Sequence, residues 1–148
     1  MEVRLNYSQV NPEALQAMLK LEGFIKTSGL DAKLYELIKI RASQINGCAF
    51  CIDMHTRDLR NMGETEQRIN LLTAWREAPF YSDKERALLE LTETVTRISE
   101  NGVPQAVYEN VRKHFDEKEY VVLIMAINII NAWNRIAIST GMFPAAQE

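Results

Sequence analysis

The chain has 148 residues, of which 47% are hydrophobic and 25% charged, and its net charge at pH 7 is -3. This length and composition are typical of one globular domain with a buried core, so we expect a single domain over residues 1–148. The pI near 5.5 and the interleaving of both charge signs exclude a nucleic-acid partner, because phosphate binding needs clustered Lys and Arg.

Two segments bear on export and on membrane association. Residues 1–11 carry Glu2 and Arg4 and have no apolar run of the kind that a secretory signal needs, so we expect a cytoplasmic protein. Residues 120–134 form the longest uncharged stretch, but they are fewer than the ~20 that cross a bilayer and include three Asn. We therefore expect a buried helix there and no membrane partner.

Glycine and proline positions divide the chain into stretches of helical periodicity, and no stretch shows the alternation of a strand. Two of the expected helices begin with a capping box, Ser82 with Glu85 and Asp116 with Glu119. Gly47 is placed to end one helix just before the next begins. The sequence predicts an all-α bundle of about seven helices, over residues 11–29, 31–47, 48–63, 65–79, 82–102, 104–115 and 116–141.

The last expected helix is apolar around most of its circumference from Val121 to Ile138. Such a helix lies at the centre of a bundle or in a subunit interface, and we expect both here. Asn128, Asn131 and Asn134 recur along it, and buried amides need hydrogen-bond partners. They form either a polar stripe that bonds across the bundle or between subunits, or a set of substrate contacts.

The chemistry of the chain gathers around Cys48 and Cys51. Two cysteines three residues apart on a helix have Cα atoms roughly 5 to 6 Å apart, so they can close a disulfide with little backbone motion. At a helix N-terminus the macrodipole lowers the pKa of a thiol, which favours Cys48 as the more acidic one. The pair is therefore predicted to carry redox chemistry.

Two further side chains are expected beside the thiols. His55 follows Cys51 by four residues, so its imidazole can reach the same helix face and take the thiol proton. If the helices on either side of Gly47 form a hairpin, Glu36 comes to the height of His55 and can orient its imidazole. The candidate catalytic residues are thus Cys51, Cys48, His55 and Glu36.

Other interpretations of these residues remain open. Cys48, Cys51 and His55 are zinc-ligand types, but a closed structural site needs a fourth ligand and the remaining histidine is His114, so we expect no metal. Covalent haem would need a histidine directly after Cys51, where Ile52 stands, and we expect no cofactor. Purely structural thiols are the third alternative.

Two segments resemble a known family. These are ELIKIRASQINGCAFCIDMH, from Glu36 to His55, and INAWNRIAI, from Ile130 to Ile138. Their Glu, CxxC and His spacing is similar to that of the alkylhydroperoxidase AhpD-like, carboxymuconolactone decarboxylase superfamily, and the likeness extends from about Leu34 to the end. The decarboxylase branch lacks the CxxC, which argues against lactone decarboxylation here.

The resemblance implies an all-helical homo-oligomer, a trimer or hexamer, that acts as a thiol peroxidase in antioxidant defence. Carried over by position, Cys51 is the peroxidatic thiol, Cys48 the resolving thiol, and His55 and Glu36 the proton relay. The partners implied are a hydroperoxide substrate and a dithiol reductant, either a small molecule or carried by a protein.

The chain departs from AhpD at one position of the motif. AhpD has a histidine just before the second cysteine, where this chain has Phe50, so its peroxidase activity is expected to be weaker or its substrate different. Two other functions stay open beside the peroxidase. One is a thiol-disulfide oxidoreductase acting on disulfides, and the other is a metal-bound or redox-switched binding module without turnover.

Overall fold

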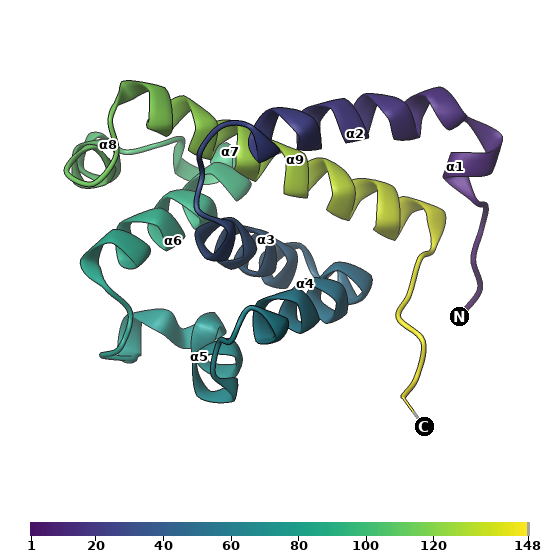
Figure 1. The fold of residues 1–148 in the computed structure, drawn as a ribbon, viewed down its shortest axis with the longest axis horizontal. Helices are drawn as coiled ribbons and strands as arrows, with labels where there is room; N and C mark the ends of the chain where they lie inside the picture. Colours follow the sequence, from purple (N-terminus) through teal and green to yellow (C-terminus); the bar gives the residue numbers. More distant parts are fainter. Residues whose placement is uncertain (148) are drawn as a thin grey trace.

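The structure, a computed structural model, describes residues 1–147. All regular secondary structure in this range is helical, as the sequence predicts (Figure 1). The elements in chain order are α1 (Tyr7–Val10), α2 (Pro12–Lys26), α3 (Ala32–Asn46), α4 (Ala49–Asn61), α5 (Glu66–Leu71), the 3-10 helix η1 (Leu72–Glu77), α6 (Asp83–Thr96), α7 (Ile98–Asn101), α8 (Gln105–Arg112) and α9 (Glu117–Thr140).

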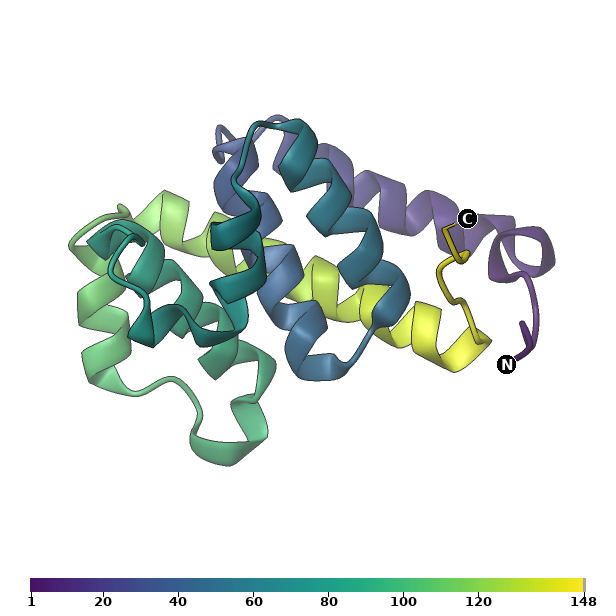
Figure 2. The ribbon, with the colours of Figure 1, turned by 90° about the horizontal axis from the view of Figure 1, so that it is seen from below.

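Helix α3 is the centre of the bundle. Every residue from 35 to 43 is buried, because α4, α6 and α9 all pack against this helix. Helix α2 lies along α9, whereas α5, η1, α6 and α8 form the opposite end of the molecule (Figures 1 and 2). The two chain ends lie at the same end of the molecule as the start of α4 (Figure 2).

The expected helix boundaries are confirmed where caps define them. Gly47 ends α3 in the left-handed conformation, with φ 71°. Both capping boxes are present, Ser82 with Glu85 at the start of α6 and Asp116 with Glu119 at the start of α9. These local interactions satisfy backbone N–H groups that a helix start leaves unpaired, so they fix the starts independently of tertiary packing.

The predicted number of about seven helices is wrong, since residues 1–147 contain nine α-helices and one 3-10 helix. The expected helix over 82–102 breaks at Arg97, whose ψ is 38°, and Ile98 is left 57% exposed instead of buried. Three β-branched residues in a row, at 94–96, precede the break and weaken the helix. The expected helix over 65–79 likewise tightens into η1, and Ala74 leaves the helical region.

Helix α1 is an element that the sequence analysis missed. It is a single turn, in which the Asn6 side chain accepts a hydrogen bond from the Gln9 N–H at 3.3 Å. A turn this short has no hydrophobic period to reveal it. It carries Tyr7, whose ring packs edge-on against Trp133 of α9 with centroids 6.5 Å apart.

Among the described residues, α9 is the one helix long and apolar enough to cross a membrane, with a mean hydropathy of 1.7 over 18 residues. Half of that window is buried within the bundle, as in a core helix of a globular protein. The other side of α9 leaves Val121 and Ile138 exposed. The expectation that this last helix forms the centre of the bundle is therefore wrong, since α3 is the more completely buried helix and α9 packs against it.

Two of the three asparagines on α9 bond across the bundle, as expected. Asn46, at the end of α3, donates one N–H to Asn131 and the other to Asn134, each at 2.9 Å. Asn134 in turn donates to the Ser43 hydroxyl at 2.9 Å. Asn128 is exposed. The amide network holds the end of α3 against α9 at the point where the next helix begins.

Candidate active site

The turn between α3 and α4 places both cysteines at the start of a helix. Cys48 is the N-cap of α4, and its sulfur accepts a hydrogen bond from the Cys51 backbone N–H at 3.4 Å. Both thiols are free, and they are only 1% and 2% exposed. Ala137 of α9 is buried against them, with Phe50 and Met142 packed around the group.

The two thiols differ in acidity. The pKa of Cys48 is lowered from 9.0 to about 7, mainly because the Cys51 thiol donates a hydrogen bond to its sulfur; burial opposes this shift, and the Cys51 N–H and Asn134 amide support it. The pKa of Cys51 is raised, because its proton is held by Cys48 and because the thiol is buried. The first charge therefore forms on Cys48, as the helix-dipole argument predicts.

Glu36 and His55 meet across the α3–α4 hairpin. The His55 Nδ1 and Glu36 Oε2 atoms are 3.1 Å apart, and both side chains are buried. The contact lacks the alignment of a hydrogen bond, and neither atom has a hydrogen-bond partner elsewhere in residues 1–147. The hairpin thus brings Glu36 to the height of His55, the geometry expected from the spacing around Gly47.

Lys39 is a member of this cluster that the sequence analysis missed. Its Nζ atom is 2.5 Å from Glu36 Oε1, and the side chain is 8% exposed, with the ammonium 4.1 Å from the Tyr35 ring centroid. Burial alone would raise the pKa of Glu36, but the contacts with His55 and Lys39 outweigh it and lower that pKa. The sequence could have indicated this contact, because Lys39 follows Glu36 by three residues and so lies one turn along the same helix.

The zinc alternative is not assembled in the part of the chain that the structure describes. The one group there with metal-ligand spacing is Glu36, His55 and Asp58, in which Asp58 Oδ2 lies 3.7 Å from His55 Nδ1, and it includes neither cysteine. The Lys39 ammonium, 2.5 Å from Glu36 Oε1, places a positive charge within this group. This cluster is a chain of charged side chains, not a cysteine zinc site.

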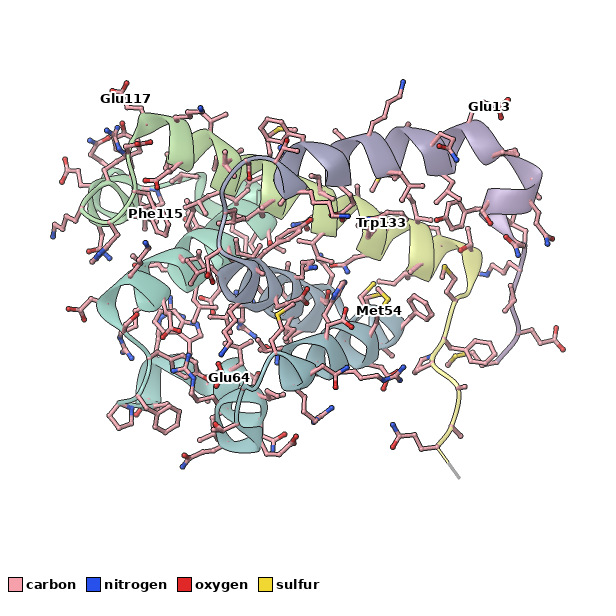
Figure 3. All side chains as sticks on the ribbon, viewed as in Figure 1. Glu13, Met54, Glu64, Phe115, Glu117 and Trp133 are labelled. Carbon is pink, nitrogen blue, oxygen red and sulfur yellow. The ribbon has the colours of Figure 1, made fainter. Side chains whose placement is uncertain are left out.

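A pocket of about 330 Å³ opens beside these residues. Of the two cysteines, Cys51 lines it and Cys48 does not. Met54 on α4 and Trp133 on α9 line it from different helices (Figure 3). The full lining is Tyr7, Glu22, Lys39, Phe50, Cys51, Met54, His55, Trp133 and Met142, so a few polar groups stand among aromatic and thioether side chains.

Glu22 fixes one wall of this pocket. Its carboxylate accepts hydrogen bonds from the Tyr35 hydroxyl and from the Trp133 indole N–H, each at 2.9 Å. These bonds join the consecutive helices α2 and α3 to α9, whose Trp133 is 111 residues away from Glu22 in the sequence. The Trp133 ring is therefore held in place beside Cys51 and His55 by residues that no local pattern connects.

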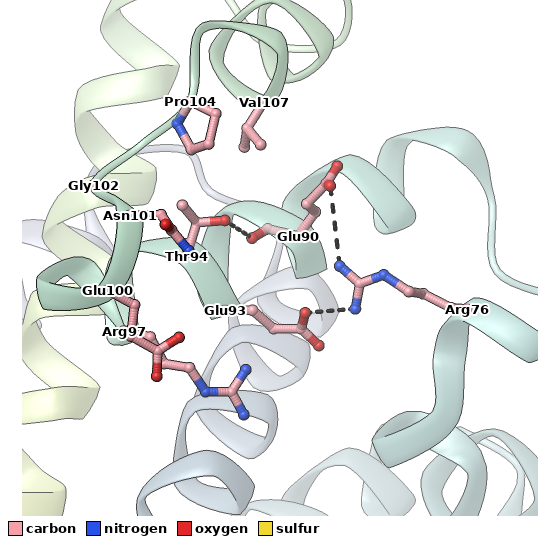
Figure 4. Close-up of a pocket in the computed structure, with 10 residues that line it drawn as sticks. All are labelled: Arg76, Glu90, Glu93, Thr94, Arg97, Glu100, Asn101, Gly102, Pro104 and Val107. Carbon is pink, nitrogen blue, oxygen red and sulfur yellow. Dashed lines mark hydrogen bonds and ion pairs between the residues drawn. The ribbon is translucent and has the colours of Figure 1, made fainter.

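A second pocket, of about 230 Å³, lies at the other end of the bundle (Figure 4). Arg76 pairs there with Glu93 at 2.6 Å, and Glu93 also accepts from the Arg41 guanidinium at 2.8 Å and from the Trp75 indole at 2.9 Å. No cysteine or histidine lines this pocket within the described residues. The network joins α3, η1 and α6.

The sequence and the structure were compared with known proteins. The profile of the carboxymuconolactone decarboxylase family matches residues 12–94. The uncharacterised protein YdfG of Bacillus subtilis is 52% identical over 141 residues, which are 95% of this chain and 96% of YdfG. These matches cover the hairpin and all four candidate catalytic residues.

Two solved structures share the fold. One is a protein of unknown function from Agrobacterium tumefaciens, described as a candidate antioxidant defence protein AhpD; it has a TM-score of 0.94 and 46% identity, covering 98% of this chain and 100% of the other. The second is an uncharacterised peroxidase-related protein from a Silicibacter species, with a TM-score of 0.80 and 26% identity, covering 92% and 72%. The resemblance inferred from the motif is thus confirmed. The chain belongs to the carboxymuconolactone decarboxylase family, and its fold is AhpD-like.

Proposed function

We propose that the protein is a thiol peroxidase that reduces hydroperoxides and serves antioxidant defence. The observation that carries this proposal is the position of Cys51, which lines a largely apolar pocket with His55 while Cys48 lies directly behind it. The family membership and the AhpD-like fold support it. Access, rather than acidity, selects Cys51 as the attacking thiol.

The first step transfers one oxygen atom to sulfur. Cys51 gives its proton to Cys48, to which it is hydrogen-bonded, or to His55 one turn further along α4. The Cys51 thiolate attacks the outer oxygen of the hydroperoxide, the O–O bond breaks, and the departing alkoxide takes up a proton and leaves as an alcohol. Cys51 is now a sulfenic acid.

The second step closes the disulfide. The Cys48 sulfur attacks the sulfenic sulfur of Cys51, the S–O bond breaks, and the hydroxide leaves as water after taking a proton. Overall, two thiols and one hydroperoxide give one disulfide, one alcohol and one water. An external dithiol then reduces the disulfide and becomes a disulfide itself.

Glu36 acts through His55. Its carboxylate contacts the His55 Nδ1 atom, so it orients the imidazole and stabilises its protonated form while the alkoxide leaves. Lys39 holds the other oxygen of the same carboxylate. Glu36 and Lys39 are therefore positioning residues.

The proposal also includes the location, the assembly and the reductant of the enzyme. It works in the cytoplasm as a homo-oligomer, a trimer or hexamer, with a dithiol reductant that is free or carried by a protein. Exposed apolar side chains on α2 and α9, namely Phe24, Val121 and Ile138, support association through these helices. Sedimentation velocity at micromolar concentration tests this part, and a purely monomeric protein would overturn it.

The test of the mechanism is peroxide consumption with dithiothreitol or dihydrolipoamide as the reductant. Cys51→Ser abolishes turnover, and Cys48→Ser reduces one equivalent and stops with a trappable sulfenic acid on Cys51. His55→Ala lowers kcat/KM on the order of 10²-fold or more. His114→Ala, at the end of α8, is the matched control and keeps the wild-type rate. Equal turnover in the wild type and Cys51→Ser would overturn the mechanism.

The same protein preparations distinguish the alternative functions. Faster reaction with a small disulfide than with any hydroperoxide would select a thiol-disulfide oxidoreductase.

A further inference from the structure

Asn134 of α9 lies behind the turn that carries the two cysteines, and its side chain is completely buried. It is bonded to the last turn of α3. The Asn46 amide donates to the Asn134 oxygen at 2.9 Å, and Asn134 donates to the Ser43 hydroxyl at 2.9 Å. Three residues further along α9, Ala137 packs against both thiols. Helix α9 therefore presents a side-chain amide where the sulfurs are enclosed.

The neighbouring hydrogen bonds define which way the Asn134 amide points. The Ile127 carbonyl can only accept, so it takes an N–H of Asn131 at 2.9 Å and leaves the Asn131 oxygen to accept from Asn46. Asn46 is therefore a donor on this side, and it meets the oxygen of Asn134. The Asn134 nitrogen consequently lies on the side of Ser43 and the cysteines.

The Asn134 nitrogen carries two N–H groups, and the network described so far uses only one of them. Ser43 accepts the first, because its own hydroxyl proton is donated to the Lys39 carbonyl at 2.7 Å. The second is left for the sulfurs of Cys48 and Cys51. This contact acts to lower the pKa of either thiol, beside the larger effects of the thiol–thiol hydrogen bond and of burial.

Charged side chains are kept to one side of the thiols. The pocket side is faced by ionisable groups from three helices, His55 of α4, Lys39 of α3 and Glu22 of α2. The enclosed side is packed with side chains that carry no charge, namely Ala137, Phe50 and Met142. Arg135, which follows Asn134 on α9, is exposed and bonds to Asn131 instead. A thiolate on the enclosed side therefore depends on hydrogen bonds from neutral donors.

We propose that Asn134 is a positioning residue of the dithiol site, whose amide N–H stabilises the thiolate on whichever cysteine carries the charge and thereby raises the reduction potential of the pair. A thiolate accepts a hydrogen bond from an amide strongly, whereas a disulfide sulfur accepts it only weakly. The contact therefore favours the reduced form and makes the disulfide easier to reduce.

The catalytic consequence of this inference rests on the proposed function. In the peroxidase cycle, the Asn134 N–H stabilises the Cys51 thiolate while it attacks the hydroperoxide. It then stabilises the Cys48 thiolate while that attacks the sulfenic sulfur. One donor thus serves both chemical steps, because the two sulfurs share it.

The main experiment measures the equilibrium between the protein and dithiothreitol at pH 6 and at pH 9. Asn134→Leu keeps a side chain branched at the same carbon but has no donor. At pH 9 the Cys48 thiol, with its pKa of about 7, is ionised, so in the variant the equilibrium constant for disulfide formation rises roughly tenfold, a potential lower by about 30 mV. At pH 6 the reduced form is mainly thiol, and the difference is less than about twofold.

Asn131→Ala is the matched control. Asn131 is one turn before Asn134 on the same helix and bonds to the same Asn46, but its own N–H groups go to Thr96 and Ile127. This variant loses stability in urea and keeps the wild-type potential at both pH values. If it shifts the potential as much as Asn134→Leu does, packing explains the effect and the inference is wrong.

Asn134→Ala decides the question if Asn134→Leu does not fold, because the smaller side chain also lacks the donor and fits the same space. A wild-type potential in Asn134→Ala at pH 9 would overturn the inference. The equilibrium needs no peroxide, so it tests Asn134 apart from the proposed function. If no hydroperoxide oxidises Cys51, the proposed function fails. If Cys51 is oxidised but the Asn134 variants keep the wild-type potential, only this inference fails.

Discussion

Cys48 and Cys51 divide between them two properties that a peroxidatic thiol usually combines. Cys48 is the more acidic sulfur but has no place in the pocket, and Cys51 faces the pocket but holds its proton more tightly. In the proposed mechanism, the hydrogen bond between them lets the charge move to Cys51 when a substrate arrives. After the proposed oxidation of Cys51, a protonated Cys48 has only to lose its proton again to attack the sulfenic sulfur.

The first residue-scale prediction concerns thiol titration. The ultraviolet thiolate absorbance of the reduced wild type rises with a midpoint near the pKa of about 7 for Cys48, below the usual 9.0. In Cys48→Ser this rise in absorbance near pH 7 is absent. In Cys51→Ala the midpoint moves up, because the side-chain donor that stabilises the Cys48 thiolate is gone. If Cys48→Ser still shows a rise in thiolate absorbance near neutral pH, the low pKa does not belong to Cys48.

The same shift has a consequence for stability. Because the pKa of Cys48 is lowered on folding, its ionisation adds to the free energy of unfolding at alkaline pH. That contribution is fully present above the unfolded pKa near 9.0 and is lost as the pH falls through about 7. Urea unfolding of wild type and Cys48→Ser across this range measures it, and the difference between the two narrows at the lower pH.

The second residue-scale prediction concerns Lys39. In Lys39→Met the ammonium that lowers the pKa of Glu36 is gone, so that pKa rises and the acid limb of the kcat/KM profile moves to higher pH. The stabilisation that ionised Glu36 gives is then lost at a higher pH on acidification. Lys39→Arg retains the wild-type profile. Pre-steady-state oxidation rates from acid to neutral pH measure the shift.

Lys33→Met is the matched control for Lys39. Lys33 is on the same helix and exposed, so its loss leaves the pH profile as in the wild type. If Lys39→Met lowers the rate equally at every pH, Lys39 has a packing role only and does not act on Glu36.

The residues of the motif could be placed from the sequence because short-range geometry defines them. Cys48, Cys51 and His55 share one helix, and Gly47 brings Glu36 alongside through one tight turn. The roles assigned to them stay predictions until the variants are measured. The remaining pocket residues, such as Tyr7, Trp133 and Met142, could not be found in this way, because they come from segments that meet only when the chain ends dock.

At the scale of elements, local sequence patterns predicted where helices begin better than they predicted whether the helices continue without a break. The capping boxes at Ser82 and Asp116 begin α6 and α9 as expected. The break at Arg97 and the change to η1 have no comparable marker, because the hydrophobic period continues through both. A period shows which face of a helix is apolar, but not whether the backbone remains helical.

The element-scale prediction concerns the end of α9. A Cβ atom at Gly141 would lie 2.8 Å from the Glu2 carbonyl oxygen and 3.1 Å from the Arg4 nitrogen, and φ there is +76°. Gly141→Ala therefore adds a clash to the left-handed strain of roughly 1–2 kcal/mol, and it pushes the N-terminal segment off α9. Urea unfolding measures the loss of stability.

Gly63→Ala is the control for that substitution. Gly63 has φ +90° but no atom within 4 Å of its would-be Cβ, so it reports the backbone strain alone. Gly141→Ala is expected to be the more destabilising of the two. Equal losses of stability would show that the contact with residues 2–4 does not hold the chain ends together.

At the scale of the whole molecule, the sequence predicted the fold class and family but not the central helix. Helix α9 has the longest uncharged stretch, yet α3 is the more completely enclosed, although it carries Glu36, Lys39 and Arg41. Its charges are buried because each has a partner, such as Glu93 for Arg41 at 2.8 Å. From hydrophobicity alone, α9 would be expected at the centre of the bundle. The pairing of the charged side chains on α3 explains how that helix occupies the centre instead.

The cover of the two cysteines by Ala137 and Met142 also sets an order of events during synthesis. The CxxC segment leaves the ribosome long before α9 exists. At about 5–20 residues per second, translation needs roughly ten seconds to reach the end of that helix. Throughout this interval the thiols of the nascent chain are accessible to oxidants of any size, whereas in the folded chain Cys48 and Cys51 are only 1% and 2% exposed.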